Sequence, residues 1–209
     1  MDSDASAALF GPPLLSPGIP GRRSCDGLVV RCEANRVIAT VCTMNQNYDA
    51  ILGLRAIRQF ADRPVDPADL DAVLEAARWT GSSKNLQNWS FIVVDDPQQK
   101  ARLESAGDFT TPIANAPMAI CLVQEPDGYE FDTGRLAQNI MLAADAIGLA
   151  TCPITLHRDE VAAEVLGLPE GRRCRYAVAI GYPAPSSEPG RMGGRKPMRE
   201  VAHRNAYGS

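Results

Sequence analysis

The chain has 209 residues, a formal net charge of −4 at pH 7 and a hydrophobic fraction of 45%. This length suits a single domain that buries a core of its own. The mildly acidic charge gives no reason to expect nucleic acid, whose binding proteins usually carry basic patches. The sequence also lacks a run of about 18 apolar residues, which argues against a membrane span.

Cysteine and histidine are the residues that would indicate a metal site, and the chain has six and two of them. No two cysteines form a Cys-x-x-Cys pair, so a zinc site has few possible ligands and we expect no metal. Cys121 and Cys174 lie in apolar runs, where a cysteine usually acts as a small core residue. A reduced, cytoplasmic protein is the simplest interpretation.

The first 43 residues differ in composition from the rest of the chain. They are rich in Pro, Gly, Ser and Ala and show neither a helical nor a strand period. We therefore expect residues 1–43 to form a disordered extension. Met44 opens a stretch that reads like an ordinary N-terminus, so the predicted folded domain covers residues 44–209.

Helix and strand signals alternate along this domain. Asp66 and Pro67 make a strong helix start, because Asp can cap the free N–H groups and Pro suits the first helical position. The apolar run 90–94 predicts a strand buried on both faces. Helices are likewise expected to begin near residues 48, 97, 132 and 159, and strands are expected at 118–123, 150–154 and 176–180. A sheet covered by helices on both faces fits this alternation best.

The common motifs of hydrolases, of zinc proteases, of Rossmann cofactor sites and of phosphate-binding loops are absent from the sequence. It has no Gly-x-Ser-x-Gly elbow, no His-Glu-x-x-His zinc motif, no Gly-x-Gly-x-x-Gly turn and no Walker loop. His157 follows a predicted strand end and His203 lies in the tail, where surface histidines are more common than catalytic ones. We therefore expect a bound cofactor to carry the chemistry, with the protein supplying binding, orientation and electrostatics.

A flavin mononucleotide (FMN) matches the polar groups that the chain offers. Its phosphate needs cations, its ribityl chain needs hydroxyl and amide partners, and its ring needs backbone N–H groups beside an apolar wall. The chain provides candidates for each part: Arg55, Arg58 and Arg195 for the phosphate, Ser82, Ser83, Asn85 and Gln87 for the ribityl chain, and the strand end 153–156 for the ring.

From about residue 48 to residue 208 the sequence resembles the FMN-dependent nitroreductase family. Four features carry the resemblance, and their order and spacing make it specific although each is weak alone. They are Arg55-Ala56-Ile57-Arg58-Gln59-Phe60 followed by Pro64-Val65; Ser82-x-x-Asn85-x-Gln87-x-Trp89-x-Phe91; the helix 132–148 running into 149–152; and the segments 166–171, 180–183 and 194–197.

The resemblance implies an α+β fold with a central mixed β-sheet flanked by helices on both faces. It also implies a domain-swapped homodimer with FMN at the subunit interface and a C-terminal arm on each FMN-binding domain. The first motif, Arg55, Ala56, Ile57 and Arg58, would bind the phosphate end, joined by Arg195 and Lys196 from the arm.

The same resemblance assigns the ring contacts. The strand end Ile154, Thr155 and Leu156 would face the ring, with the N–H groups of Thr155 and Leu156 directed at N5 and O4. The partner subunit would contribute Gly81, Ser82 and Ser83, with Asn85 and Gln87 fixing that loop or the ring edge. Lys84 would stand at the mouth of the substrate cavity.

The implied activity is NAD(P)H-driven, two-electron reduction of nitroaromatic, quinone or related small molecules by ping-pong hydride transfer. The flavin carries the reaction, and the sequence does not identify a catalytic side chain. Leu54, Ala56 and Asn88 depart from the family pattern, which more often has Arg, Ser and Pro there. Asn88 and Lys84 leave open an FMN-dependent oxidase or dehydrogenase of a peptide-derived metabolite such as a cyclic dipeptide, with oxygen as acceptor. A flavin-binding docking protein, a further protein subunit and the choice between NADH and NADPH also stay open.

Overall fold

The computed structural model describes residues 47–188 and 194–208, so the predicted extension 1–43 lies outside the described residues. A helical stretch at residues 47–53 comes first. The elements that follow are α2 (Pro67–Arg78), the 3-10 turn η1 (Ser83–Asn85), β1 (Trp89–Val94), α3 (Pro97–Glu104), α4 (Thr111–Asn115), β2 (Met118–Gln124), α5 (Glu130–Ala146), β3 (Ala150–Thr155), α6 (Asp159–Leu166), β4 (Arg173–Gly181) and α7 (Met198–Val201).

The four strands form one sheet in the order β1–β2–β4–β3, and all three pairings are antiparallel. This arrangement differs from the predicted mixed sheet. β2 and β3, the two strands that α5 connects, run in the same direction, but β4 lies between them. The order of elements along the chain does not determine which strands become neighbours, and here the insertion of β4 removes the parallel pair.

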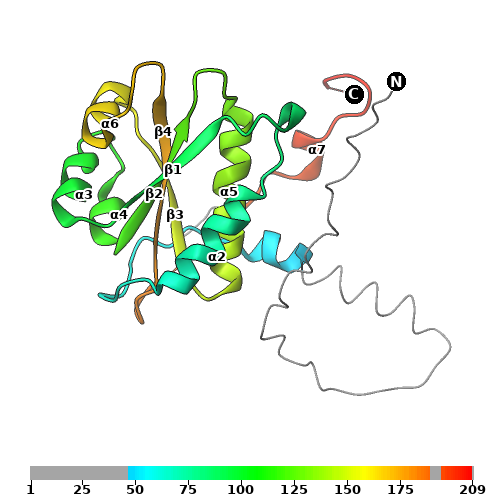
Figure 1. Ribbon diagram of the computed structural model, residues 1–209. Coiled ribbons are helices and arrows are strands. Elements are labelled where there is room, and N and C mark those ends of the chain that lie inside the picture. The colour runs from blue at the N-terminus through cyan, green and yellow to red at the C-terminus, as the bar shows by residue number, and fades with distance from the viewer. Residues whose placement is uncertain (1–46, 189–193, 209) are drawn as a thin grey trace, which may run out of the picture. The chain divides into compact units, whose positions relative to one another are not determined.

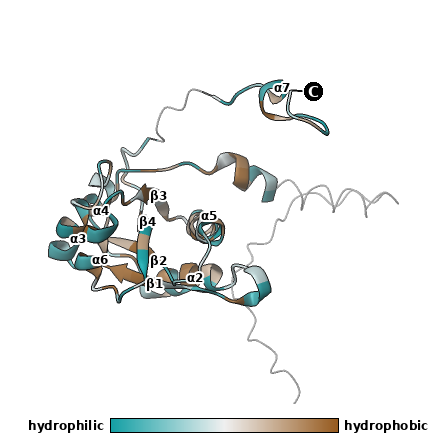
Figure 2. Cartoon of the chain, turned by 90° about the horizontal axis from the view of Figure 1, so that it is seen from above, coloured by the Kyte–Doolittle hydropathy of each residue, from teal (hydrophilic) through white to brown (hydrophobic). Residues whose placement is uncertain are grey.

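A layer of helices covers each face of the sheet (Figure 1), which confirms the predicted α+β class. Figure 2 shows α2 and α5 on one side of the strands and α3, α4 and α6 on the other. The α2–α5 side buries Ile120, Leu136 and Ile140, and the opposite side buries Leu103 and Leu156. The core therefore consists of two apolar layers separated by the sheet.

Local sequence explains where several helices begin and end. The Asp66 carboxylate accepts a hydrogen bond from Ala68 N at 2.9 Å, and the Asp96 carboxylate accepts one from Gln99 N at 2.6 Å. Caps of this kind stabilise a helix by about 1 kcal/mol each. Gly148 follows α5 with a φ angle of 83°, a left-handed conformation that glycine adopts without steric cost.

The central strand β2 and the edge strand β1 differ in how far their residues are buried. Every residue from Met118 to Val123 is buried, as predicted. The prediction of a fully buried strand at 90–94 was wrong, because only Val94 is buried and Ser90 is exposed. β1 has a neighbouring strand on one side only, so its residues keep more contact with water.

Cys121 and Cys174 have no exposed surface, which confirms their predicted core roles. A hydrogen bond with Cys174, together with burial, raises the pKa of the Cys121 thiol. The second described segment, 194–208, contains the single short helix α7. None of the helices in the described ranges is long and apolar enough to cross a membrane.

Candidate functional site

The free edge of β3 offers hydrogen-bonding groups that no neighbouring strand of the described sheet uses. Leu156 N donates to Arg175 O at 2.8 Å, and Leu156 and Ile154 therefore direct their backbone groups toward β4. In an antiparallel pair this direction alternates from one residue to the next. Thr151 and Thr155 consequently point the other way, and Thr151 O accepts the Ile57 N–H at 2.8 Å. The Thr155 N–H is thus directed to the free edge.

Pro153 lies between these two threonines and has the same orientation along the strand. A proline has no N–H to donate, which confines it within sheets mainly to edge positions. Pro153 is exposed, as an edge position allows. Along residues 153–155, the donor that this edge offers to a ligand is therefore the Thr155 N–H.

A cavity of about 420 Å³ lies between this strand end and the first half of α5. Volumes of roughly 300–1,000 Å³ are typical of small-molecule sites. The wall on the helix side is formed largely by small residues. The residues that line the cavity are Glu130, Thr133, Gly134 and Ala137 of α5, Pro153, Ile154 and Thr155 of β3, and Tyr176 and Ala177 of β4.

The motif Arg55 to Phe60 is held against the sheet by backbone hydrogen bonds on both of its sides. Besides the bond from Ile57 to Thr151, Ala184 N donates to Gln59 O at 3.2 Å, and Phe60 forms an isolated bridge with Pro183. The segment therefore runs as an extended strap beside the first part of β3. This pairing fixes the backbone from which the two arginines project.

The two arginines line separate cavities of this chain. Arg55 and Ile57 line one of about 330 Å³, whereas Arg58 lines another of about 320 Å³ together with Ser186 and Glu188. Nη1 of Arg55 donates at 2.7 Å to the carbonyls of Leu52 and Leu54, at the end of the first helical stretch. The two arginines that were predicted to bind the phosphate therefore line two different cavities.

Arg58 also influences the nearby strand β3. Burial raises the pKa of the Cys152 thiol, and the positive charge of Arg58 opposes that rise. Ala56, between the two arginines, packs against the core on the α3–α6 side and serves the structure of the strap.

The loop between α2 and β1 has an unusual backbone. Lys84, Asn85 and Gln87 have φ angles of 51°, 55° and 52°. Left-handed backbone at a residue other than glycine costs about 1–3 kcal/mol and occurs preferentially at functional sites. The Ser82 hydroxyl accepts the Gln87 N–H at 2.9 Å and so closes the loop.

The surroundings of this loop leave most of it open to solvent. Residues 83–87 are exposed, and Gly81 O accepts a hydrogen bond from Nη1 of Arg135 on α5. The three cavities described above are lined by other residues, so this chain alone does not bring the loop into them.

The two tail cations that the sequence indicates belong to the segment 194–208. Arg195 donates to Gly194 O at 3.2 Å, and Lys196 is exposed. Their part in phosphate binding therefore stays a prediction. Across residues 47–188 and 194–208, no group of three or more His, Cys, Asp or Glu side chains could hold a metal ion.

A model of the nitroreductase family matches residues 51–108 and 110–182, which is more than half of the chain. The chain belongs to the nitroreductase family. It is 28% identical over 193 residues to the FMN reductase (NADPH) of Bacillus subtilis, covering 78% of this chain and 75% of that protein.

Solved structures of this family have the same fold. Nitroreductase A from Vibrio parahaemolyticus aligns with a TM-score of 0.71 at 27% identity, covering 79% of this chain and 78% of that one. An FMN-dependent nitroreductase from Clostridium difficile aligns with a TM-score of 0.65 at 27% identity, covering 74% and 96%. These likenesses confirm the family that the sequence motifs indicate.

In this member of the nitroreductase family, the geometry of β3 changes one predicted contact. The Leu156 N–H does not fit the role of a ring donor, because it already donates to Arg175 O and the residue is fully buried. The two predicted donors are adjacent in sequence, and adjacent residues in a strand face opposite edges. Ile154 lines the cavity between β3 and α5, but its backbone also faces β4.

The cavity residues contributed by α5 and β4 were not identified from the sequence. Gly134 was the one residue whose type could have indicated the cavity. Glycine inside a helix is about 1 kcal/mol less favourable than alanine, so its presence there calls for a reason. A Cβ added at Gly134 would meet no atom within 4 Å. Packing within this chain therefore does not require a glycine there, and space for a ligand or a partner is the better explanation.

We expect Gly134→Ala to raise the free energy of unfolding of the cofactor-free chain by about 0.5–1 kcal/mol, because alanine favours the helix. Gly134→Leu is expected to keep the fold and to weaken FMN binding, since the larger side chain fills the cavity. Chemical denaturation and FMN titration of both variants measure the two effects. Unchanged FMN binding in Gly134→Leu would mean that the cavity has another occupant.

Proposed function

We propose that the chain is an FMN-dependent oxidoreductase that uses NADH or NADPH to reduce small-molecule acceptors, among them nitroaromatics and quinones. The observation that carries this proposal is the Thr155 N–H, which points away from β4 at the edge of the sheet, beside a ligand-sized cavity that Thr155 lines. Family membership and the relatives named as FMN reductase and nitroreductase support it.

The residues around the cavity fit a flavin ring. Thr155 would donate its N–H to the polar edge of the ring, while Pro153, Ala137 and Ala177 provide apolar surface. When bound, FMN supplies the two-electron chemistry that links NAD(P)H to the acceptor. The contribution of this chain is to orient the ring, to exclude water from its apolar faces and to leave room for a second flat molecule.

The phosphate would be bound by the first motif. Arg55 and Arg58 carry fixed positive charges on the strap beside β3, and charge-assisted hydrogen bonds to phosphate are among the stronger polar contacts in proteins. Arg195 and Lys196 would add further charge from the tail. The strap suits this role because its backbone is fixed independently of the cofactor.

A second copy of the chain would complete the site. The exposed loop 83–87 keeps its left-handed residues in a fixed shape without using them for packing in its own chain. We infer that this loop contacts the flavin bound by the partner subunit and that Lys84 lies at the entrance for substrate. The functional unit would then be a homodimer with two interfacial flavins.

Anaerobic reduction tests this proposal. The purified chain should bind FMN, lose visible flavin absorbance when NADH or NADPH is added, and regain it with a nitroaromatic or quinone. A preparation that takes up no FMN would contradict the cofactor assignment. A flavin that neither nucleotide bleaches would contradict the reductase direction and favour an oxidase or dehydrogenase.

A further inference from the structure

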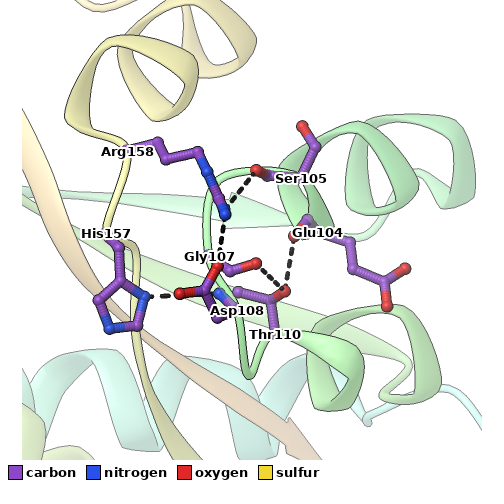
Figure 3. A network of polar contacts seen from close by, with 7 residues as sticks. All are labelled: Glu104, Ser105, Gly107, Asp108, Thr110, His157 and Arg158. Carbon is purple, nitrogen blue, oxygen red and sulfur yellow. Dashed lines mark hydrogen bonds and ion pairs between the residues drawn. The ribbon is translucent and has the colours of Figure 1, made fainter.

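A network of polar contacts fastens the loop at residues 105–110, here named the 105–110 loop, to the chain that leaves β3 (Figure 3). Arg158 N donates to Ala106 O at 2.9 Å, and Arg158 Nη1 donates to Ser105 O at 3.0 Å. Arg158 Nη2 also pairs with the Asp108 carboxylate. One arginine thus makes three contacts with the loop.

The loop is stabilised from within as well. The buried Thr110 hydroxyl donates to Glu104 O at 2.6 Å and lies 3.2 Å from Gly107 O. Asp108 N approaches Nδ1 of His157 at 3.5 Å. Figure 3 shows these side chains gathered between the loop and the segment that precedes α6. These contacts hold the loop against the chain that leaves β3.

Gly107 brings this loop into contact with the backbone of Thr155. A Cβ added at Gly107 would lie 2.7 Å from Thr155 O and 2.6 Å from Cγ2 of Thr110. Such distances are closer than real Cβ atoms approach other atoms, so the glycine is required for the loop to pack here. The neighbours of Thr155 pair with β4 on one edge of the strand, and Gly107 of the loop lies against Thr155 O on the other.

We propose that the 105–110 loop, fastened by Arg158, positions the Thr155 amide for the flavin ring. Arg158 is then a positioning residue, since it acts through the loop and through Thr155 rather than on the cofactor. Small displacements of a hydrogen-bond donor weaken the bond steeply, so release of the loop should lower FMN affinity. This inference rests on the proposed function, in which the Thr155 N–H contacts FMN.

A double-mutant cycle on FMN affinity tests the inference. Arg158→Gln removes the side-chain contacts to Ser105 and Asp108 and is expected to raise the FMN dissociation constant about 3- to 10-fold. In a chain that also carries Thr155→Pro, which lacks the amide N–H, the same substitution should change it by no more than about twofold. An equal factor in both backgrounds, or no effect in either, would overturn the inference.

Two further variants keep the test independent of folding defects. Asp108→Asn weakens the ion pair with Arg158 but retains the Asp108 N–H, and it should shift the visible absorption band of bound flavin in the same direction as Arg158→Gln. Arg102→Gln is the matched control, because Arg102 also links the α3 region to α6, through Glu164 at 3.8 Å. It should change neither the affinity nor the spectrum, and thermal denaturation verifies that each variant is folded.

The outcomes separate this inference from the proposed function. If the unmodified chain binds no FMN, or if Thr155→Pro leaves FMN affinity unchanged, the proposed contact with Thr155 is itself wrong. If Thr155→Pro weakens binding but Arg158→Gln does not, the contact stands and the positioning role of the loop is refuted.

Discussion

Replacement of both Arg55 and Arg58 with alanine is expected to weaken FMN binding about 100-fold or more, while leaving riboflavin binding unchanged. Riboflavin has the same ring and ribityl chain as FMN but no phosphate. Each charge-assisted hydrogen bond to phosphate contributes about 1.5–3 kcal/mol, so losing two removes a large share of the affinity. Titrating the cofactor-free protein with both flavins, by fluorescence quenching, measures the difference.

The single variants and a control make this experiment specific. Because Arg55 and Arg58 line different cavities, the single variants indicate which hollow holds the phosphate. Arg63→Ala is the control, since Arg63 belongs to the same region and its guanidinium stacks 3.8 Å from the centre of the Tyr182 ring. FMN and riboflavin affinities that fall together in the double variant would indicate a structural effect and contradict the phosphate assignment.

Two proline substitutions at neighbouring positions at the end of β3 are expected to affect different properties: Thr155→Pro the affinity for FMN, and Leu156→Pro the stability of the fold. Thr155→Pro removes an N–H that faces the free edge, so the sheet should persist while FMN affinity falls about 10-fold. Leu156→Pro removes the N–H that donates to Arg175 O and also replaces a fully buried side chain. It should therefore lower the free energy of unfolding by about 3 kcal/mol or more.

Thr155→Val is the matched control for this pair, because it keeps the N–H and the side-chain shape but removes the hydroxyl. It should bind FMN like the unmodified chain. Circular dichroism, chemical denaturation and FMN titration distinguish loss of fold from loss of the contact. A Thr155→Pro variant that is folded and binds FMN normally would contradict the proposed contact between the Thr155 N–H and the flavin ring.

Local sequence predicted the helices well because their signals need only neighbouring residues. Asp66 and Asp96 cap α2 and α3 as expected, since an aspartate reaches N–H groups two or three residues ahead whatever surrounds the helix. Burial of β1 was predicted less well. An apolar run such as 90–94 indicates a strand, but whether that strand is central or at an edge depends on residues far away in the sequence.

Some features of the candidate site were likewise predictable from local sequence, and others were not. The arginine motif and the loop 81–87 are recognisable in the sequence because both are short, contiguous patterns. The direction of the Thr155 and Leu156 N–H groups depends on the register between β3 and β4, which a shift of one residue would reverse. The cavity wall on α5 was missed because it forms only where the helix packs over β3 and β4.

The amino-acid sequence by itself determined the capped starts of α2 and α3, the apolar strands and the family, since each rests on spacing along one stretch of chain. The start of α5, which has no side-chain cap, was expected at residue 132 and lies at Glu130. Only the tertiary structure decided the antiparallel strand order, the free edge at Thr155 and the support that the 105–110 loop gives to it. These features arise from contacts between segments distant in sequence, where backbone hydrogen bonds and close packing select one register among several that the local pattern allows.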